Sequence, residues 1–151
     1  MKKFIFFGLL GLILAFFSSC STSAPECKYH VQTLDLTVVE ADWLFDQDAG
    51  QFYYHFDVPE ITAHVYNYGN WTVCREYNFG TKDAYQVSLP ESRYMWEEVT
   101  ESTGEKYIVY FTQHIDYRVG IGYVEVQLTN SDYVYDAHNP ETMHFRLQLI
   151  Y

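Results

Sequence analysis

The stretch MHFRLQLIY, residues 143–151, alternates apolar and polar side chains almost without a break. Met143, Phe145, Leu147, Leu149 and Tyr151 fall on one side of this pattern. A period of two residues is typical of a β-strand with one face buried. Because the alternation continues to Tyr151, the stretch predicts a strand that is paired within a sheet and packs on a core.

The same alternation recurs along the rest of the chain. Seven further runs show it: 34–38, 52–58, 71–77, 85–89, 94–96, 107–115 and 124–128. The run 71–77 places Trp71, Val73 and Tyr77 on one face, and Arg75 interrupts that face. No amphipathic helix of three turns appears, so we expect an all-β fold. The prediction is an antiparallel, immunoglobulin-like β-sandwich of about eight strands, spanning residues 29–151.

Turn residues separate the predicted strands. Asp48-Ala49-Gly50 is typical of a hairpin with glycine at a positive φ. The segment 59–69 departs from the alternation, since Ile61, Val65 and Tyr68 share one helical face. Pro59 is suited to start a helix and Gly69 to end it, which predicts a short helix near 59–68. Residues 129–141 are predicted to form a long loop.

The first residues form the pattern of a secretory signal. Lys2 and Lys3 precede an apolar run, 4–17, of 14 residues. A membrane-spanning helix needs about 20 apolar residues, so this run is short for a permanent anchor. The following Phe17-Ser18-Ser19-Cys20 resembles a bacterial lipobox, with Phe17 where leucine is usual.

The lipobox resemblance predicts how the N-terminus is processed. It implies a signal peptide over 1–19 and attachment of fatty acyl chains, such as palmitate, to Cys20 as the new N-terminus. Two or more acyl chains give stable membrane anchoring. Residues 20–28 are then a lipidated tether of small and polar residues. The alternative is an ordinary signal peptide cut near Ser19 or Ala24.

These features predict a lipid-anchored protein of the cell envelope. Some bacteria export lipoproteins to the cell surface through an acidic run after the cysteine. Glu26 is the only acidic residue between Cys20 and Cys27, which slightly favours the periplasmic side over the cell surface. The expected membrane contact is through the N-terminal lipid.

Charge excludes one class of partner. The formal net charge of −11 becomes −13 once Lys2 and Lys3 leave with the signal peptide. A domain this acidic repels phosphate backbones, and no basic stripe is visible, so nucleic acid is not an expected partner. Two cysteines remain beside Cys20, namely Cys27 and Cys74. An envelope compartment permits a disulfide between them; the alternative is two unpaired thiols, with Cys74 half-buried.

A search for catalytic or metal-binding patterns returns only weak candidates. The pairs His55 with Asp57 and His114 with Asp116 share strand faces, but such pairs arise by chance. Asp42, Asp46 and Asp48 precede Gly50, yet strands flank them, which excludes an EF-hand. No Gly-x-Ser-x-Gly elbow is present, and with 20 acidic residues a test for paired carboxylates has no power. We therefore predict no catalytic residue, no metal site and no cofactor.

Aromatic side chains are the best functional lead. The chain has 15 Tyr, 11 Phe and 3 Trp. Tyr68, Trp71, Tyr94 and Trp96 lie near turns or strand ends, where flat rings can stack on sugar faces. The alternative is that these rings fill the sandwich core, as Tyr and Trp often do.

Several stretches of the chain resemble a known group of proteins. They are DW at 42–43, YYHFDVPEIT at 53–62, VY at 65–66, Gly69, REY at 75–77, LP at 89–90 and MHFRL at 143–147. Together they resemble uncharacterised lipoproteins of Bacteroidetes-type gut bacteria. The resemblance implies a small secreted β-sandwich and supplies no catalytic residue. Trp71 and Cys74 alter the valine-rich strand that usually follows Gly69 in this group.

The sequence therefore predicts a non-enzymatic cell-envelope lipoprotein that acts as a binding or assembly module. Three alternatives stay open: a carbohydrate-binding protein that uses exposed aromatics, a fimbrial or accessory subunit that pairs through a strand edge, and a small hydrolase. The expected partners are a glycan or another envelope protein.

Overall fold

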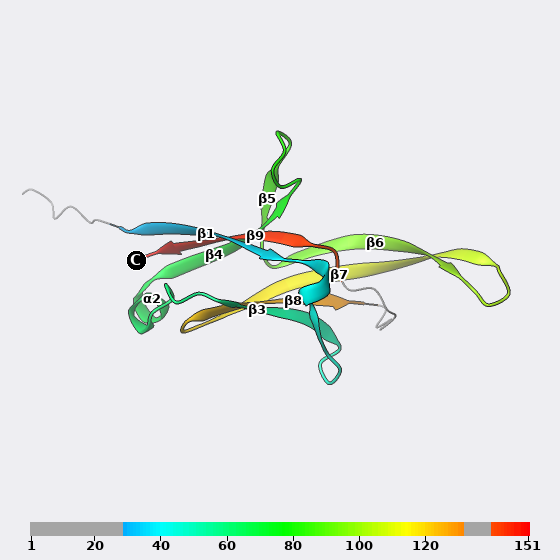
Figure 1. Ribbon diagram of the computed structural model, residues 1–151, viewed down its shortest axis with the longest axis horizontal. Helices are drawn as coiled ribbons and strands as arrows, with labels where there is room; N and C mark the ends of the chain where they lie inside the picture. Colours follow the sequence, from blue (N-terminus) through cyan, green and yellow to red (C-terminus); the bar gives the residue numbers. More distant parts are fainter. Residues whose placement is uncertain (1–28, 132–139) are drawn as a thin grey trace, which may run out of the picture.

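Two antiparallel β-sheets form the fold in the computed structural model, which describes residues 29–131 and 140–151 (Figure 1). One sheet has the strand order β1-β9-β4-β5, and the other β2-β3-β8-β7-β6. The bounds are β1 Val31–Val38, β2 Leu44–Asp46, β3 Gln51–Asp57, β4 Asn70–Tyr77, β5 Tyr85–Ser88, β6 Glu91–Thr100, β7 Lys106–Gly120, β8 Tyr123–Asn130 and β9 Met143–Ile150. The expected all-β antiparallel sandwich is confirmed. The predicted signal peptide and the predicted tether 20–28, with Cys20, lie outside the described residues.

Strand β9 forms the centre of the four-stranded sheet. It pairs with β1 on one side and with β4 on the other. Met143, Phe145, Leu147 and Leu149 are all buried, whereas the residues between them are at least partly exposed. Tyr151 continues the pairing through two backbone hydrogen bonds to His30, of 2.6 and 3.0 Å. The prediction of a paired C-terminal strand is therefore confirmed.

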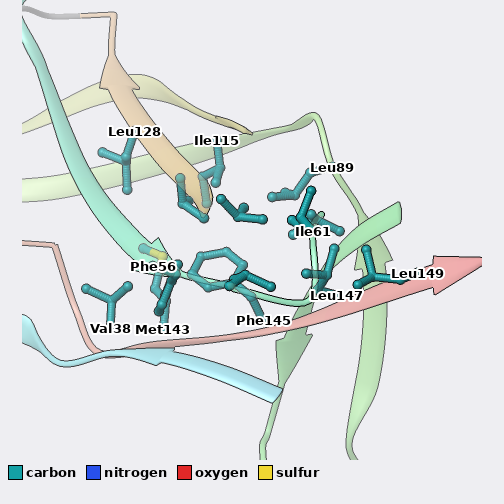
Figure 2. Close-up of a cluster of buried hydrophobic side chains, with 14 of the residues drawn as sticks. Val38, Phe56, Ile61, Leu89, Ile115, Leu128, Met143, Phe145, Leu147 and Leu149 are labelled. Carbon is teal, nitrogen blue, oxygen red and sulfur yellow. The ribbon is translucent and has the colours of Figure 1, made fainter. Parts of the chain in front are cut away.

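The core lies between the two sheets. Figure 2 shows Phe145, Leu147 and Leu149 on one side of it, with Phe56, Ile115 and Leu128 from the facing sheet. Burial of these side chains is the main favourable contribution to folding.

Two local details make the sequence prediction more specific. The described residues hold nine strands rather than about eight, because β2 contains only three residues and is too short for its alternation to be read. The helix α2 covers Ala63–Tyr68 and begins four residues after Pro59, because the side chain of Thr62 caps its N-terminus by accepting a hydrogen bond from the Val65 amide. Gly69 ends the helix as expected. Tyr68 is exposed, whereas Ile61 and Val65 are buried.

The hairpin of β6 and β7 extends beyond the rest of its sheet (Figure 1). Strand β8 pairs with β7 only from Gln113 onward, and Ser131 adds two hydrogen bonds with the backbone of Thr112. Beyond this point the hairpin is a two-stranded ribbon, closed by a turn at Gly104, whose φ is 86°. We call residues 94–112 the arm. A two-stranded ribbon without a covering layer is only marginally stable by itself, so its root must be well held.

Candidate functional site

Three aromatic rings line one face of the arm. Trp96 pairs with Tyr110 across the two strands, and Tyr94 lies two residues before Trp96 on the same face. The exposed fractions are 93% for Tyr94, 66% for Trp96 and 74% for Tyr110. This face is the outer face of the five-stranded sheet. Ile108, 52% exposed, extends the apolar surface toward the tip.

The opposite face of the arm is largely apolar and includes one charged residue, Glu97. It carries Met95, Val99, Val109 and Phe111, and each of these side chains is partly exposed. No side chain of the arm is buried. Large apolar side chains on both faces of a projecting ribbon make the arm a candidate contact surface, because monomeric soluble proteins rarely leave large apolar patches uncovered.

The tip of the arm is acidic. The arm contains Glu97, Glu98, Glu101 and Glu105, and its only basic residue is Lys106. Lys106 Nζ lies 2.5 Å from Glu98 Oε1 in an exposed ion pair, which contributes little to stability. A tip of this charge is unsuited to insertion into an anionic membrane surface.

The structure separates the four sequence-predicted stacking residues into two places. Tyr94 and Trp96 lie together on the arm. Tyr68 and Trp71 lie at α2 and the start of β4, toward the other end of the molecule (Figure 1). Trp71 is partly buried against the core and stacks on Tyr66, with 5.6 Å between ring centroids. The core interpretation therefore holds for Trp71. Tyr68 is exposed, and the ring of His64 lies beside it, with 5.2 Å between ring centroids.

Tyr110 completes the ring surface, and sequence reasoning missed it. The available signal is the hairpin register. A turn centred near Thr103 places residue 110 opposite residue 96. Counting outward from the polar residues 101–104 would place residue 109 opposite residue 96. The pairing of residue 110 with residue 96 follows only from the structure, in which Thr100 pairs with Lys106.

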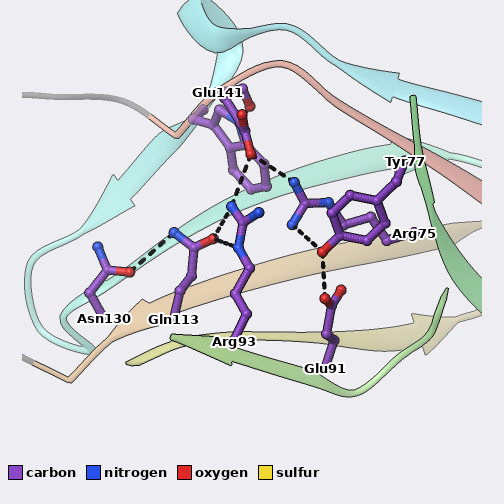
Figure 3. Close-up of polar contacts among 8 residues, drawn as sticks. Arg75, Tyr77, Glu91, Arg93, Gln113, Asn130 and Glu141 are labelled. Atoms are coloured by element: carbon purple, nitrogen blue, oxygen red, sulfur yellow. Dashed lines mark hydrogen bonds and ion pairs between the residues drawn. The ribbon is translucent and has the colours of Figure 1, made fainter. Parts of the chain in front are cut away.

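A cluster of polar side chains fills the root of the arm between the two sheets (Figure 3). Glu141 lies at its centre and bridges two arginines: its Oε1 is 2.8 Å from Arg75 Nη2 and 2.9 Å from Arg93 Nη2. Arg93 also donates two hydrogen bonds, of 2.9 and 2.6 Å, to Oε1 of Gln113. Gln113 in turn donates to Asn130 Oδ1 at 3.3 Å.

The cluster ties the arm to the sandwich. Arg93 and Gln113 are the last paired residues before the arm begins, on β6 and β7 respectively. Arg75 comes from β4 in the other sheet, and Glu141 lies two residues before the start of β9. Because charge-assisted hydrogen bonds are directional, this set fixes the orientation of the arm relative to both sheets.

Opposing effects set the pKa of Glu141. Burial disfavours its ionised form, but the hydrogen bonds and positive charges of Arg93 and Arg75 outweigh burial and lower the pKa below its ordinary value. Glu141 is therefore a carboxylate at neutral pH. Arg75, whose side chain is only 5% exposed, depends on this charge for its compensation.

Tyr77 extends the cluster toward β6. Its hydroxyl accepts a hydrogen bond of 3.0 Å from Arg75 Nη1 and donates one to Glu91 Oε1. Burial, followed by the hydrogen bond to Glu91, raises the pKa of Tyr77 to about 12. The second oxygen of Glu91, Oε2, is buried and accepts no hydrogen bond in the described part of the protein. The sequence signal for this cluster was Arg75, which interrupts the apolar face of its strand.

The remaining sequence candidates lie elsewhere. Cys74 is half-buried on the outer face of β4, with its Sγ 3.7 Å from Ser88 Oγ. Cys27 lies outside the described residues, so the disulfide stays a prediction. The exposed pairs His55 with Asp57 and His114 with Asp116 are each 4.0 Å apart. Across residues 29–131 and 140–151, no three His, Cys, Asp or Glu side chains gather closely enough to hold a metal ion.

No helix in the described ranges combines the length and apolar character needed to span a membrane. Comparisons with protein-family models, curated proteins and solved structures return no match to this chain. The site must therefore be interpreted from its own geometry.

Proposed function

We propose that the protein is a non-enzymatic lipoprotein of the cell envelope that works as a binding or assembly module through its arm. The observation that carries this proposal is the arm itself. It presents Tyr94, Trp96 and Tyr110 to solvent on one face and partly exposed apolar side chains on the other. Its root is held by ion pairs and hydrogen bonds. A rigidly held apolar surface loses little entropy on binding, which favours affinity.

The cellular location that we propose for the protein rests on its N-terminal residues. We propose that residues 1–19 are removed, that Cys20 is acylated and that the tether 20–28 joins the lipid to the sandwich. This agrees with the resemblance to Bacteroidetes-type lipoproteins. The periplasmic side is slightly favoured over the cell surface.

Cys20→Ala is expected to release the protein from the membrane. Without the thiol no acyl chain can be attached, and the anchoring free energy of about 0.8 kcal/mol per buried methylene is lost. Fractionation of cells that express either form measures this: the parent chain should sediment with membranes and the variant should not. Membrane association that persists in the variant would contradict lipidation at Cys20, and Cys74→Ala serves as the matched control.

Carbohydrate binding is the second candidate, and the row of exposed rings favours it. Tyr94 and Trp96 are adjacent on one strand face, and Tyr110 lies across from Trp96. Rings in this arrangement can stack on successive sugar units, while the acidic surface favours neutral or basic sugars over acidic ones.

Trp96→Ala is expected to weaken glycan binding by roughly thirtyfold, since truncation of a central tryptophan costs about 2 kcal/mol. An array of neutral and amino-sugar glycans, probed with the soluble domain, measures the effect. Tyr68→Ala is the matched control, because Tyr68 is 78% exposed but lies far from the arm. If the parent domain binds no glycan above background, or if both variants lose binding equally, the carbohydrate function is rejected.

A further inference from the structure

Strand β6 leaves one of its edges open. In the ordering β2-β3-β8-β7-β6 it is the last strand, so within the described ranges only β7 pairs with it. Its ten residues, Glu91–Thr100, therefore present a row of backbone donors and acceptors along the side of the arm. An open edge of this length is a template for another strand.

The sequence of β6 matches a second copy of β6 placed antiparallel to it. Two identical antiparallel strands are related by a twofold axis, which places one residue opposite itself and pairs its neighbours symmetrically. With Met95 on the axis, Tyr94 faces Trp96 of the second copy, and Arg93, which also contacts Glu141 and Gln113 of its own copy, faces its Glu97. Each of these pairs occurs twice. Cross-strand aromatic pairs and opposite charges both stabilise a sheet.

The neighbouring registers are poorer. With Tyr94 on the axis, Glu91 faces Glu97, and with Arg93 or Glu97 on the axis two like charges meet. With Trp96 on the axis, Tyr94 faces Glu98 and Arg93 faces Val99. Like charges directly opposite destabilise strand pairs, and the Trp96 register loses both the ring pair and the pair of Arg93 with Glu97. Only the Met95 register pairs the rings with rings and the arginine with a carboxylate.

We infer that two copies of this chain associate through β6, antiparallel and centred on Met95, so that their five-stranded sheets join into one continuous sheet. This goes beyond the proposed function, because the partner is the protein itself. The outer faces of the two arms then lie side by side. Tyr110 and Trp96 of one copy continue into Tyr94 of the other, which makes one ring surface from two arms.

Single cysteines test both the association and its register. In the lipidated full-length chain, with Cys27 and Cys74 replaced by serine, Met95→Cys brings two thiols together on the axis. Directly opposite residues have Cβ atoms about 5 Å apart, close enough for a disulfide after small adjustment. Copper-catalysed oxidation in mild detergent should convert Met95→Cys to a covalent dimer, seen on non-reducing gels.

The matched variants fix the register. Tyr94→Cys and Trp96→Cys should each form at least about tenfold less dimer alone, since diagonal positions are about 7 Å apart or more. Mixed together, they should cross-link to each other. Tyr68→Cys reports random collision. If Met95→Cys cross-links no faster than Tyr68→Cys, or if Tyr94→Cys alone cross-links as fast, the inference is wrong.

Sedimentation provides a second measurement that does not depend on cysteine chemistry. The parent protein should sediment as a dimer, and Glu97→Arg, which places two arginines opposite each other twice per dimer, should raise Kd about tenfold or more. A monomeric parent would overturn the inference. Membrane association and glycan binding are measured separately, so failure here is distinct from failure of the proposed function.

Discussion

Phe145→Ala is expected to lower the free energy of unfolding by about 3 to 5 kcal/mol, which is a large share of the stability of a domain of this size. Phe145 is 1% exposed and is among the largest fully buried side chains in the core. On β9 it lies between Leu36 of β1 and Arg75 of β4. Its removal leaves a cavity in the core between the two sheets and removes an apolar neighbour of the Arg75 side chain.

Ile150→Ala is the matched control for this experiment. Ile150 lies on the same strand but on its outer face, and it is 38% exposed. Its truncation should cost no more than about 1 kcal/mol. Urea denaturation followed by tryptophan fluorescence measures both variants. Equal losses of stability at the two positions would contradict the assignment of the buried face of β9.

Glu141→Ala is expected to lower the free energy of unfolding by about 2 to 4 kcal/mol. Removal of one partner of a fully buried ion pair costs about 3 to 5 kcal/mol, because the remaining charge is left without compensation. Here the effect is smaller because the Glu141 side chain is 59% exposed to solvent. Arg75 still loses its carboxylate partner, although its side chain is only 5% exposed. The hydrogen bond that it keeps is the one to the Tyr77 hydroxyl.

The control for Glu141 is Glu98→Ala. Glu98 also pairs with a basic residue, Lys106, but both side chains are more than half exposed. The change should therefore cost less than about 1 kcal/mol. Because Glu141 holds the arm root, its variant should also speed hydrogen exchange in the amides of the arm. A loss no larger than that of Glu98→Ala would show that the cluster does not stabilise the fold.

The contribution of Glu141 also depends on pH. Its pKa is lower in the folded state than its ordinary value, so the carboxylate binds protons more readily in the unfolded chain. The stabilisation is present above the unfolded pKa, about 4.3, and is lost as pH falls through the folded value.

The contribution of Tyr77 to stability depends on pH in the opposite direction. Its raised pKa of about 12 keeps its contribution intact below pH 10 and removes it as pH rises through 12.

The strands were predictable because a half-buried strand alternates apolar and polar residues, and this alternation can be read from the strand's own sequence. The run 143–151 needed no partner to be recognised. By contrast, β2 has three residues, too few to show a period, and the start of α2 depends on the Thr62 cap rather than on Pro59. The sequence showed that Tyr94 and Trp96 share one face of a strand. The position of Tyr110 opposite Trp96 required the hairpin register.

The amino-acid sequence by itself determined the class of fold and the faces of its strands, because each depends on residues close together in the chain, whereas lipidation of the N-terminus stays a prediction. Only the tertiary structure decided that β6 and β7 extend beyond the rest of their sheet and expose the rings of Tyr94, Trp96 and Tyr110. It also decided which charge compensates Arg75. Glu141 is 66 residues away from it, and nothing local links the two. A buried arginine shows that a partner is needed, but the folded arrangement of the strands chooses which carboxylate supplies it.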